Sequence, residues 1–209
     1  TKAYNINRLI FFVLISTDFN KKIKIDSPFP TGKLAYRNLF SWMNSASVNF
    51  DVGIHPSYTA TSFQDGSFTR EKAIFDRLNI SKKRKPIARA HFLRYSTKYY
   101  MELEKHKISE DFSLGSEYFM GFVNGTIRPI NPYNFELKRA IDVAICPLPV
   151  MDVTCFNSEN YLQTIDILIS SWSTFGGNFV ILWHNNYLKN KKEFNKLDVI
   201  LNKFSVCVE

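Results

Sequence analysis

Three histidines stand where predicted strands end, and imidazole nitrogens at such places can bind a metal ion or transfer a proton. His55, His91 and His184 each end or closely follow a short apolar run. In α/β proteins, ligands and catalytic groups gather at the carboxyl ends of the strands. We therefore expect the three imidazoles to share one site. A histidine at a strand end can also simply cap a loop, and this alternative stays open for each.

A hydrolytic metal site commonly uses a third protein ligand, often a carboxylate, together with a bound water. Asp51, Asp111 and Asp152 are the candidates. Asp51 and His55 lie on one face of the same predicted strand, but about 13 Å apart at a rise of roughly 3.3 Å per residue. Asp51 therefore cannot share a metal with His55 unless the strand bends. Asp111 and Asp152 are distant from His55 in the sequence and can lie near it only if the fold brings them together.

Apolar runs alternate with helical periodicities along the chain, which predicts parallel strands, crossover helices and an α/β class. We expect strands over residues 9–15, 50–54, 87–92, 108–114, 121–123, 143–145, 150–153 and 179–183. We expect helices around 34–43, from Thr69, from Ser96 or Thr97, from Asn157 or Ser158 to Gly176, and around 194–201, with residues 131–133 in a loop. No repeat or linker interrupts the pattern, so 1–209 is expected to be a single domain.

Composition narrows the class of protein. Of the 209 residues, 45% are hydrophobic, which argues against disorder, and 15% are aromatic, which suits a core of large rings or a surface that stacks sugars. The net charge of +8 is spread thinly apart from the run at 82–85, so we expect no nucleic-acid partner. No run is long enough to span a bilayer and no signal peptide is visible, so a cytoplasmic location is expected.

A series of motifs runs through nearly the whole chain in order. It begins with Gly53-Ile-His-Pro-Ser-Tyr58 and Arg89-Ala-His-Phe-Leu-Arg94, and it continues through the segments 108–115, 121–126, 150–152 and 181–184. The series resembles the polysaccharide deacetylase family (NodB-homology type), in particular a bacterial branch with G-I-H-P-S-Y and R-Q-H-F-L-R motifs. The resemblance implies an irregular (β/α) barrel and metal-dependent removal of N- or O-acetyl groups from an oligo- or polysaccharide.

The resemblance also implies roles for individual residues. His184 matches the general acid, and Arg89 matches the arginine that braces the catalytic carboxylate. Asp111 is a further candidate catalytic residue, chosen from the carboxylates of the chain. His55 and His91 are assigned to a divalent metal, expected to be zinc. Substrate-binding roles are assigned to four further residues: Tyr58, Arg94, Asp152 and Trp183.

Four departures from the family pattern bear on catalysis. The strand that ends in adjacent aspartates is missing, so the domain is expected to be incomplete at its N-terminus and to lack its first strand. Thr59 stands where the ordinary motif has a second histidine, Val123 where the branch has an arginine, and Cys146 where it has a histidine. A thiolate at Cys146 could bind zinc, although a buried inert thiol is the alternative.

These observations support two hypotheses of different classes. The first is an enzyme, a carbohydrate deacetylase that hydrolyses the acetyl groups of sugars with a metal-activated water. The second is a deacetylase-like barrel that has lost catalysis and binds a glycan or a partner protein, as the missing aspartate pair together with Val123 and Cys146 would allow.

Overall fold

The computed structural model describes residues 8–14, 41, 45, 50–62, 66–77 and 85–206, except for the side chains of 205 and 206. The chain divides into two compact units. The sheet unit comprises Arg8–Ser113 and Asn131–Ile145, and the helical unit includes Leu114–Ile130 and Cys146–Glu209. The single domain expected from the sequence stays a prediction.

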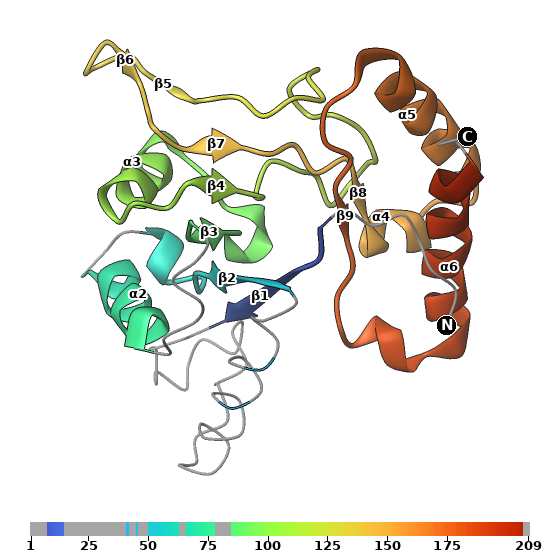
Figure 1. Cartoon of the computed structure of the whole chain (residues 1–209), viewed down its shortest axis with the longest axis horizontal. Helices are drawn as coiled ribbons and strands as arrows, with labels where there is room; N and C mark the ends of the chain where they lie inside the picture. Colours follow the sequence, from blue (N-terminus) through green and yellow to red (C-terminus); the bar gives the residue numbers. More distant parts are fainter. Residues whose placement is uncertain are drawn as a thin grey trace. The chain divides into compact units, whose positions relative to one another are not determined.

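The sheet unit is built on five parallel strands in the order β1-β2-β3-β4-β7 (Figure 1). Their bounds are β1 Ile10–Leu14, β2 Asp51–His55, β3 Ile87–Ala88, β4 Glu110–Asp111 and β7 Ala144–Ile145. The register pairs Leu14 with His55, and Ala88 with Asp111. All five residues of β2 are buried, as expected for a strand that is covered on both faces. The chain is therefore a mixed α/β protein with a parallel sheet, which is the predicted class.

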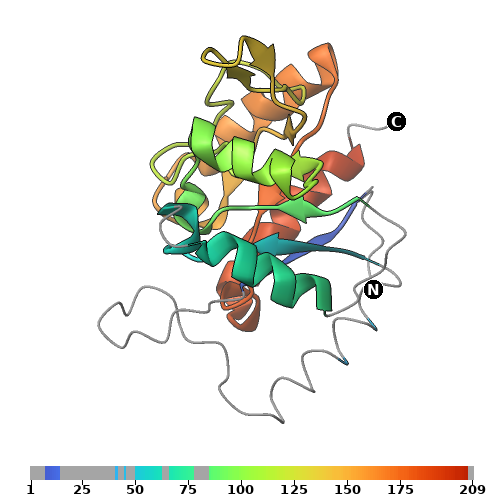
Figure 2. The same ribbon diagram turned by 90° about the vertical axis from the view of Figure 1, so that its left-hand side faces the viewer.

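Two helices connect successive strands of this sheet: α2 (Ser67–Arg77) joins β2 to β3, and α3 (Thr97–Lys105) joins β3 to β4. Right-handed crossovers place consecutive helices on the same side of a sheet, and α2 and α3 lie side by side (Figure 2). The ring of Phe68 on α2 is 5.3 Å from that of His106, which caps α3. The helix predicted to start at Ser96 or Thr97 is confirmed, and the Ser96 hydroxyl accepts the Tyr99 N–H at 3.2 Å.

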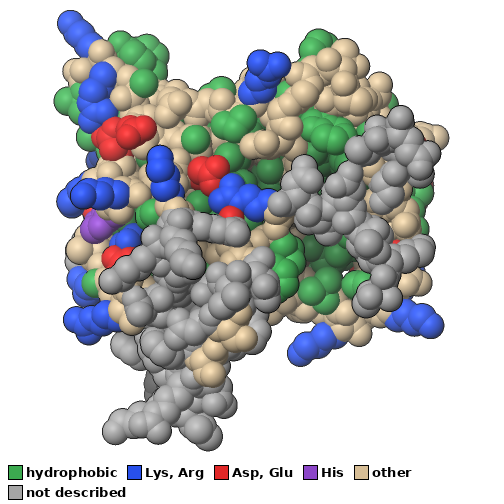
Figure 3. All heavy atoms as spheres, in the orientation of Figure 1, with side chains coloured by type: hydrophobic (Ala, Val, Ile, Leu, Met, Phe, Trp, Pro, Cys, Tyr) green, Lys and Arg blue, Asp and Glu red, His purple; other side chains and the backbone are tan. Residues whose placement is uncertain are grey.

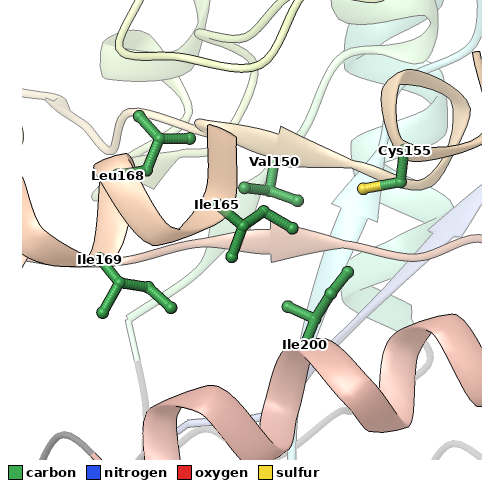
Figure 4. Packing of buried hydrophobic residues seen from close by; sticks show 6 residues of the cluster. All are labelled: Val150, Cys155, Ile165, Leu168, Ile169 and Ile200. Atoms are coloured by element: carbon green, nitrogen blue, oxygen red, sulfur yellow. The ribbon is translucent and has the colours of Figure 1, made fainter. Parts of the chain in front are cut away.

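The helical unit contains a two-stranded parallel sheet and three α-helices. The elements are β8 Val150–Met151, α4 Asp152–Phe156, α5 Tyr161–Phe175, β9 Ile181–Leu182, the 3₁₀ turn η3 Tyr187–Lys189 and α6 Lys191–Val206. Side chains from β8 and the three helices form its core (Figure 4), namely Val150, Cys155, Ile165, Leu168, Ile169 and Ile200. Gly176 ends α5 as predicted, with a φ of 69° that only glycine adopts at little cost.

The described sheets are open. The five-stranded sheet has β1 and β7 as its edges, and β8 pairs only with β9. Closure into an irregular barrel is not observed within the described ranges and stays a prediction. Only residue 41 of the helix expected around 34–43 falls within those ranges, and it is helical; Cys207 and most of the basic run at 82–85 lie outside them.

Several predicted boundaries are wrong, and each error has a local cause. The strand expected at 87–92 stops at Ala88, because residues 91–93 form the 3₁₀ turn η2 (His91–Leu93). The strand expected at 121–123 is a turn in the structure. The helix expected from Asn157 or Ser158 begins only at Tyr161, because the short helix α4 precedes it and the Asn157 N–H closes that helix on Val153.

The loop expected at residues 131–133 is observed at 131 and 132, and a β-hairpin begins at its last residue. Its strands are β5 Tyr133–Asn134 and β6 Arg139–Ala140. The Asn134 carboxamide oxygen accepts the N–H groups of Glu136 and Leu137, both at 2.9 Å, and so closes the turn. Because the hairpin depends on this side chain rather than on alternating hydrophobicity, the period-2 pattern does not reveal it.

Charged side chains of the sheet unit are interspersed rather than gathered in one patch. On the face shown in Figure 3, basic side chains over α3 and the hairpin lie beside acidic ones. Arg139 and Glu104 form one such pair at 2.7 Å.

None of the described helices combines the length and apolarity needed to cross a bilayer.

Gly53 lies at a position of β2 where any side chain would collide with its neighbours. A Cβ there would come within 2.7 Å of Phe12 Cδ1 and 2.9 Å of Ile87 Cγ1. We expect Gly53→Ala to lower the free energy of unfolding by about 1–3 kcal/mol through overpacking, measured by urea denaturation. In the double variant with Phe12→Leu, which provides room, the combined loss should be smaller than the sum of the single losses. Strict additivity would contradict this packing.

Candidate functional site

His55 ends β2, and its ring is fixed by the segment that follows β3. His55 Nδ1 is 2.5 Å from the Arg89 carbonyl oxygen, and Nε2 is 3.4 Å from Arg89 Nη2. A guanidinium only donates hydrogen bonds, so Nε2 must carry the lone pair and Nδ1 must carry the hydrogen. His55, which is only 9% exposed, is therefore neutral in this arrangement.

The segment after β3 extends the parallel pairing and brings a second imidazole to His55. The Arg89 N–H donates to the Ile54 carbonyl and the His91 N–H donates to the Pro56 carbonyl, both at 3.1 Å. The ring centroids of His55 and His91 are 5.0 Å apart, with an angle of 64° between the planes. The two histidines assigned to a metal are thus neighbours in the sheet unit.

Asp111, the predicted catalytic carboxylate, is fully buried at the end of β4. It accepts hydrogen bonds from the Tyr99 hydroxyl at 2.9 Å, the Ser113 N–H at 2.9 Å and the Ser113 hydroxyl at 2.8 Å. Burial raises the pKa of Asp111 to about 6, although the three donors and the charge of Arg89 act in the opposite direction. Since Ser113 Oγ also accepts the Ala90 N–H at 2.8 Å, the carboxylate anchors the segment that carries Arg89 and His91.

Arg89 is buried and connects three groups of the sheet unit. Its guanidinium lies 5.0 Å from the centroid of the Phe12 ring, within cation–π range, and it contacts His55 Nε2. Its charge lowers the pKa of Asp111. A role for Arg89 in bracing a catalytic carboxylate stays a prediction.

Sequence reasoning overlooked a carboxylate that fixes the loop after His55. Glu71 on α2 is fully buried and accepts the Ser57 hydroxyl at 2.5 Å and the Ser57 N–H at 3.0 Å. Ser57 Oγ in turn accepts the Ala60 N–H, which starts the 3₁₀ turn η1 (Ala60–Ser62). No periodic pattern marks Glu71, because a glutamate in an amphipathic helix normally faces solvent.

The turn η2 holds two bulky residues in a backbone conformation that favours glycine. Phe92 has a φ of 55° and Leu93 a φ of 51°, and such left-handed residues cost on the order of 1–3 kcal/mol each. Next to the turn, the Arg94 guanidinium lies 4.0 Å from the centroid of the Tyr58 ring and donates to the Tyr58 carbonyl at 3.3 Å. The two predicted substrate-binding residues Tyr58 and Arg94 are therefore in contact with each other.

The predicted general acid, His184, belongs to the helical unit. Because β8 and β9 are parallel and pair Met151 with Leu182, Asp152 and His184 follow neighbouring strand ends. The Asp152 carboxylate accepts the His184 N–H, and its two oxygens are 3.0 and 2.9 Å from His184 Nδ1. Asp152 is fully buried, whereas the His184 side chain is 41% exposed. Asp152, predicted to bind substrate, is thus positioned to orient His184.

The surroundings of Trp183 and Cys146 bear on the roles considered for them. Trp183 packs against the core of the helical unit, edge-to-face with Phe156 at 5.5 Å. Its Nε1 is buried and has no hydrogen-bond partner among the described residues. Cys146 is fully buried. A substrate-binding role for Trp183 stays a prediction.

The described residues provide two imidazoles toward a metal ion, but not a complete set of ligands. His55 presents the tautomer that a metal requires at Nε2, and His91 lies beside it. Asp51, one carboxylate candidate, is instead paired with Arg8 at the other end of β2. In the part of the chain that the structure covers, no three histidine, cysteine or acidic side chains are grouped so that they could hold a metal.

Comparisons with known proteins give one structural match. No protein-family model matches the chain, and no curated protein matches it. A crystal structure from Bordetella bronchiseptica, described as "a putative polysaccharide deacetylase involved in o-antigen biosynthesis", aligns with a TM-score of 0.39 and 17% identity. The alignment covers 73% of this chain and 60% of that one, so the chain spans less than two thirds of the matched structure. A similarity at this TM-score carries no argument about the function of the chain.

The buried carboxyl of Asp111 predicts a specific pH dependence of stability. Its pKa of about 6 lies above the 3.8 of an exposed aspartate, so the folded state binds more protons and the free energy of unfolding falls as pH rises between these values. This loss is about 3 kcal/mol at 1.36 kcal/mol per pKa unit. Asp111→Asn, which cannot ionise, should remove it, as measured by urea denaturation from pH 4 to 7.

If Asp111→Asn and the wild type lost stability equally between pH 4 and 6, Asp111 would not be the titrating group.

Proposed function

We propose that the chain is a carbohydrate deacetylase, a hydrolase that removes acetyl groups from an oligo- or polysaccharide. The observation that carries the proposal is the pair formed by Asp152 and His184. A buried carboxylate there holds the Nδ1 side of a partly exposed imidazole. This is the arrangement expected of a histidine that transfers a proton through Nε2.

Deacetylation requires a proton donor for the departing sugar nitrogen or oxygen. Water attacks the acetyl carbonyl carbon to form a tetrahedral intermediate, and the bond from that carbon to the sugar nitrogen or oxygen then breaks. In our proposal, protonated His184 donates its Nε2 hydrogen to the departing sugar atom, both protons of the attacking water pass to solvent, and acetate is released. The Asp152 carboxylate fixes the ring and stabilises its positive charge while the histidine is protonated.

The choice of a sugar substrate rests on the ordered motif series, in which the segments around His55, Arg89 and His184 resemble deacetylase motifs. We further propose that His55 and His91 contribute to binding a divalent metal, expected to be zinc. When bound, such an ion would activate water and polarise the acetyl carbonyl.

The second candidate is a glycan-binding or partner-binding domain without catalysis. The observations that favour it are Val123 and Cys146 at positions where the family branch has an arginine and a histidine, together with the incomplete ligand set in the described residues. It predicts binding of acetylated oligosaccharides without release of acetate.

Acetate release from acetylated oligosaccharides by the full-length protein tests the enzymatic role of His184. We expect His184→Ala to lower kcat by about 10²–10⁴-fold, the usual contribution of a general acid, with a much smaller change in KM. Asp152→Asn should lower kcat as well, because Nδ1 loses its charged partner. His106→Ala is the matched control, because the His106 side chain, which is 18% exposed, contacts only Glu102 and Thr69 by hydrogen bonds among the described residues, and the variant should have full activity.

If His184→Ala retained wild-type kcat, the proposed acid would be wrong. If the wild type bound the oligosaccharide but released no acetate, the second candidate function would be favoured.

The role of His55 in metal binding can be separated from its role in the fold. In His55→Asn, the Asn Nδ2 can still donate to the Arg89 carbonyl, but no atom replaces Nε2. We expect this variant to stay within about 1 kcal/mol of wild-type stability, whereas His55→Ala should cost on the order of 1–3 kcal/mol by leaving a buried carbonyl without its donor. Both variants should lose metal, measured by elemental analysis of the purified protein. Unchanged metal content in His55→Asn would exclude His55 as a ligand.

A further inference from the structure

Phe92 has three unusual properties. It is a bulky residue in the left-handed backbone region, its neighbour Leu93 is too, and its side chain is 55% exposed. A strained turn persists only where the surrounding structure imposes it, and such strain clusters at ligand sites. Here the turn keeps a large apolar ring in contact with solvent rather than burying it.

The neighbours of the Phe92 ring connect it to the two histidines. The ring centroid is 4.5 Å from that of His91, with 36° between the planes, and His91 is 5.0 Å from His55. On another side, the Tyr58 ring meets Phe92 edge-on at 6.0 Å. An exposed aromatic ring thus lies directly beside the imidazole pair.

Arg94 adds hydrogen-bond donors beside Tyr58, the ring that meets Phe92. Its guanidinium stacks on Tyr58 and donates one hydrogen bond, to the Tyr58 carbonyl. A guanidinium has five N–H donors, and within the described residues the others have no acceptor. The Tyr58 ring thus contacts both the exposed Phe92 ring and the guanidinium that offers these donors.

We propose that Phe92 is the stacking platform for an acetylated pyranose ring, with Arg94 donating to the hydroxyl or acetyl oxygens of the sugar. A pyranose has one face of C–H groups, which suits an aromatic ring, and a rim of oxygen acceptors, which suits a guanidinium. The inference rests on the proposed function and deepens it by identifying the residue that positions the sugar. Phe92 is a binding residue in this assignment and takes no part in proton transfer.

The substitution Phe92→Asn removes the aromatic ring while preserving the left-handed backbone conformation. Asparagine tolerates the left-handed region better than other non-glycine residues, so Phe92→Asn should keep the turn and should not lower the midpoint of thermal unfolding. Phe92→Tyr keeps the platform. Phe135→Asn is the control for loss of an exposed ring, because Phe135 is 83% exposed on the hairpin of the same unit.

The probe is tetra-N-acetylchitotetraose, with binding to the full-length protein measured by titration calorimetry. We expect Phe92→Asn to weaken binding about tenfold or more, Phe92→Tyr to bind within about twofold of wild type, and Phe135→Asn to bind as wild type. Nuclear Overhauser contacts between the sugar C–H protons and the Phe92 ring should accompany wild-type binding.

Wild-type affinity in Phe92→Asn, an equal loss in Phe135→Asn, or no binding of the probe by the wild type would each overturn the proposal. The experiments distinguish failure of the platform hypothesis from failure of the deacetylase hypothesis. Binding that depends on Phe92 without acetate release supports the platform and rejects the enzyme, whereas undiminished kcat/KM for acetate release in Phe92→Asn rejects the platform and leaves the enzyme standing.

Discussion

The hydrogen bonds that converge on the buried Asp111 carboxylate determine the geometry of the sheet unit around His55. A carboxylate that is removed from water is tolerated only if its oxygens are satisfied, and Tyr99 and Ser113 together provide three donors. Because Ser113 also accepts the Ala90 N–H, the same group fixes the start of the turn that carries Arg89 and His91. The positions of both imidazoles therefore depend on a charge that has no contact with solvent.

The helical unit uses a buried carboxylate in a related way. Asp152 follows β8, is fully buried, and binds both the backbone and the ring of His184. In each unit a buried aspartate at a strand end determines the orientation of a more exposed functional group. The difference in burial has a physical consequence, because a desolvated acid with several donors is rigid, whereas a partly exposed imidazole is accessible from solvent.

The sequence predicted the features that depend on local pattern. The apolar run ending at His55 is a buried parallel strand, Ser96 caps a helix, and Gly176 ends one. It did not predict features that arise from contacts between distant segments. The left-handed conformation of Phe92 contradicts its local preference and is held by the pairing of Ala90 and His91 with Ser113 and Pro56. The contact between Asp152 and His184 likewise depends on the strand register, which a single sequence does not specify.

Arg89 interacts electrostatically with both His55 and Asp111. Its guanidinium approaches the lone pair of His55 Nε2, which is the same lone pair that a metal ion would use. Both require His55 to be neutral, so the tautomer held by the Arg89 carbonyl suits either state. The two cationic partners nevertheless compete for one nitrogen, and a metal there would displace the guanidinium from it. Since Asp111 is the carboxylate that feels the charge of Arg89, any movement of this guanidinium would also change the protonation of the group that holds the turn in place.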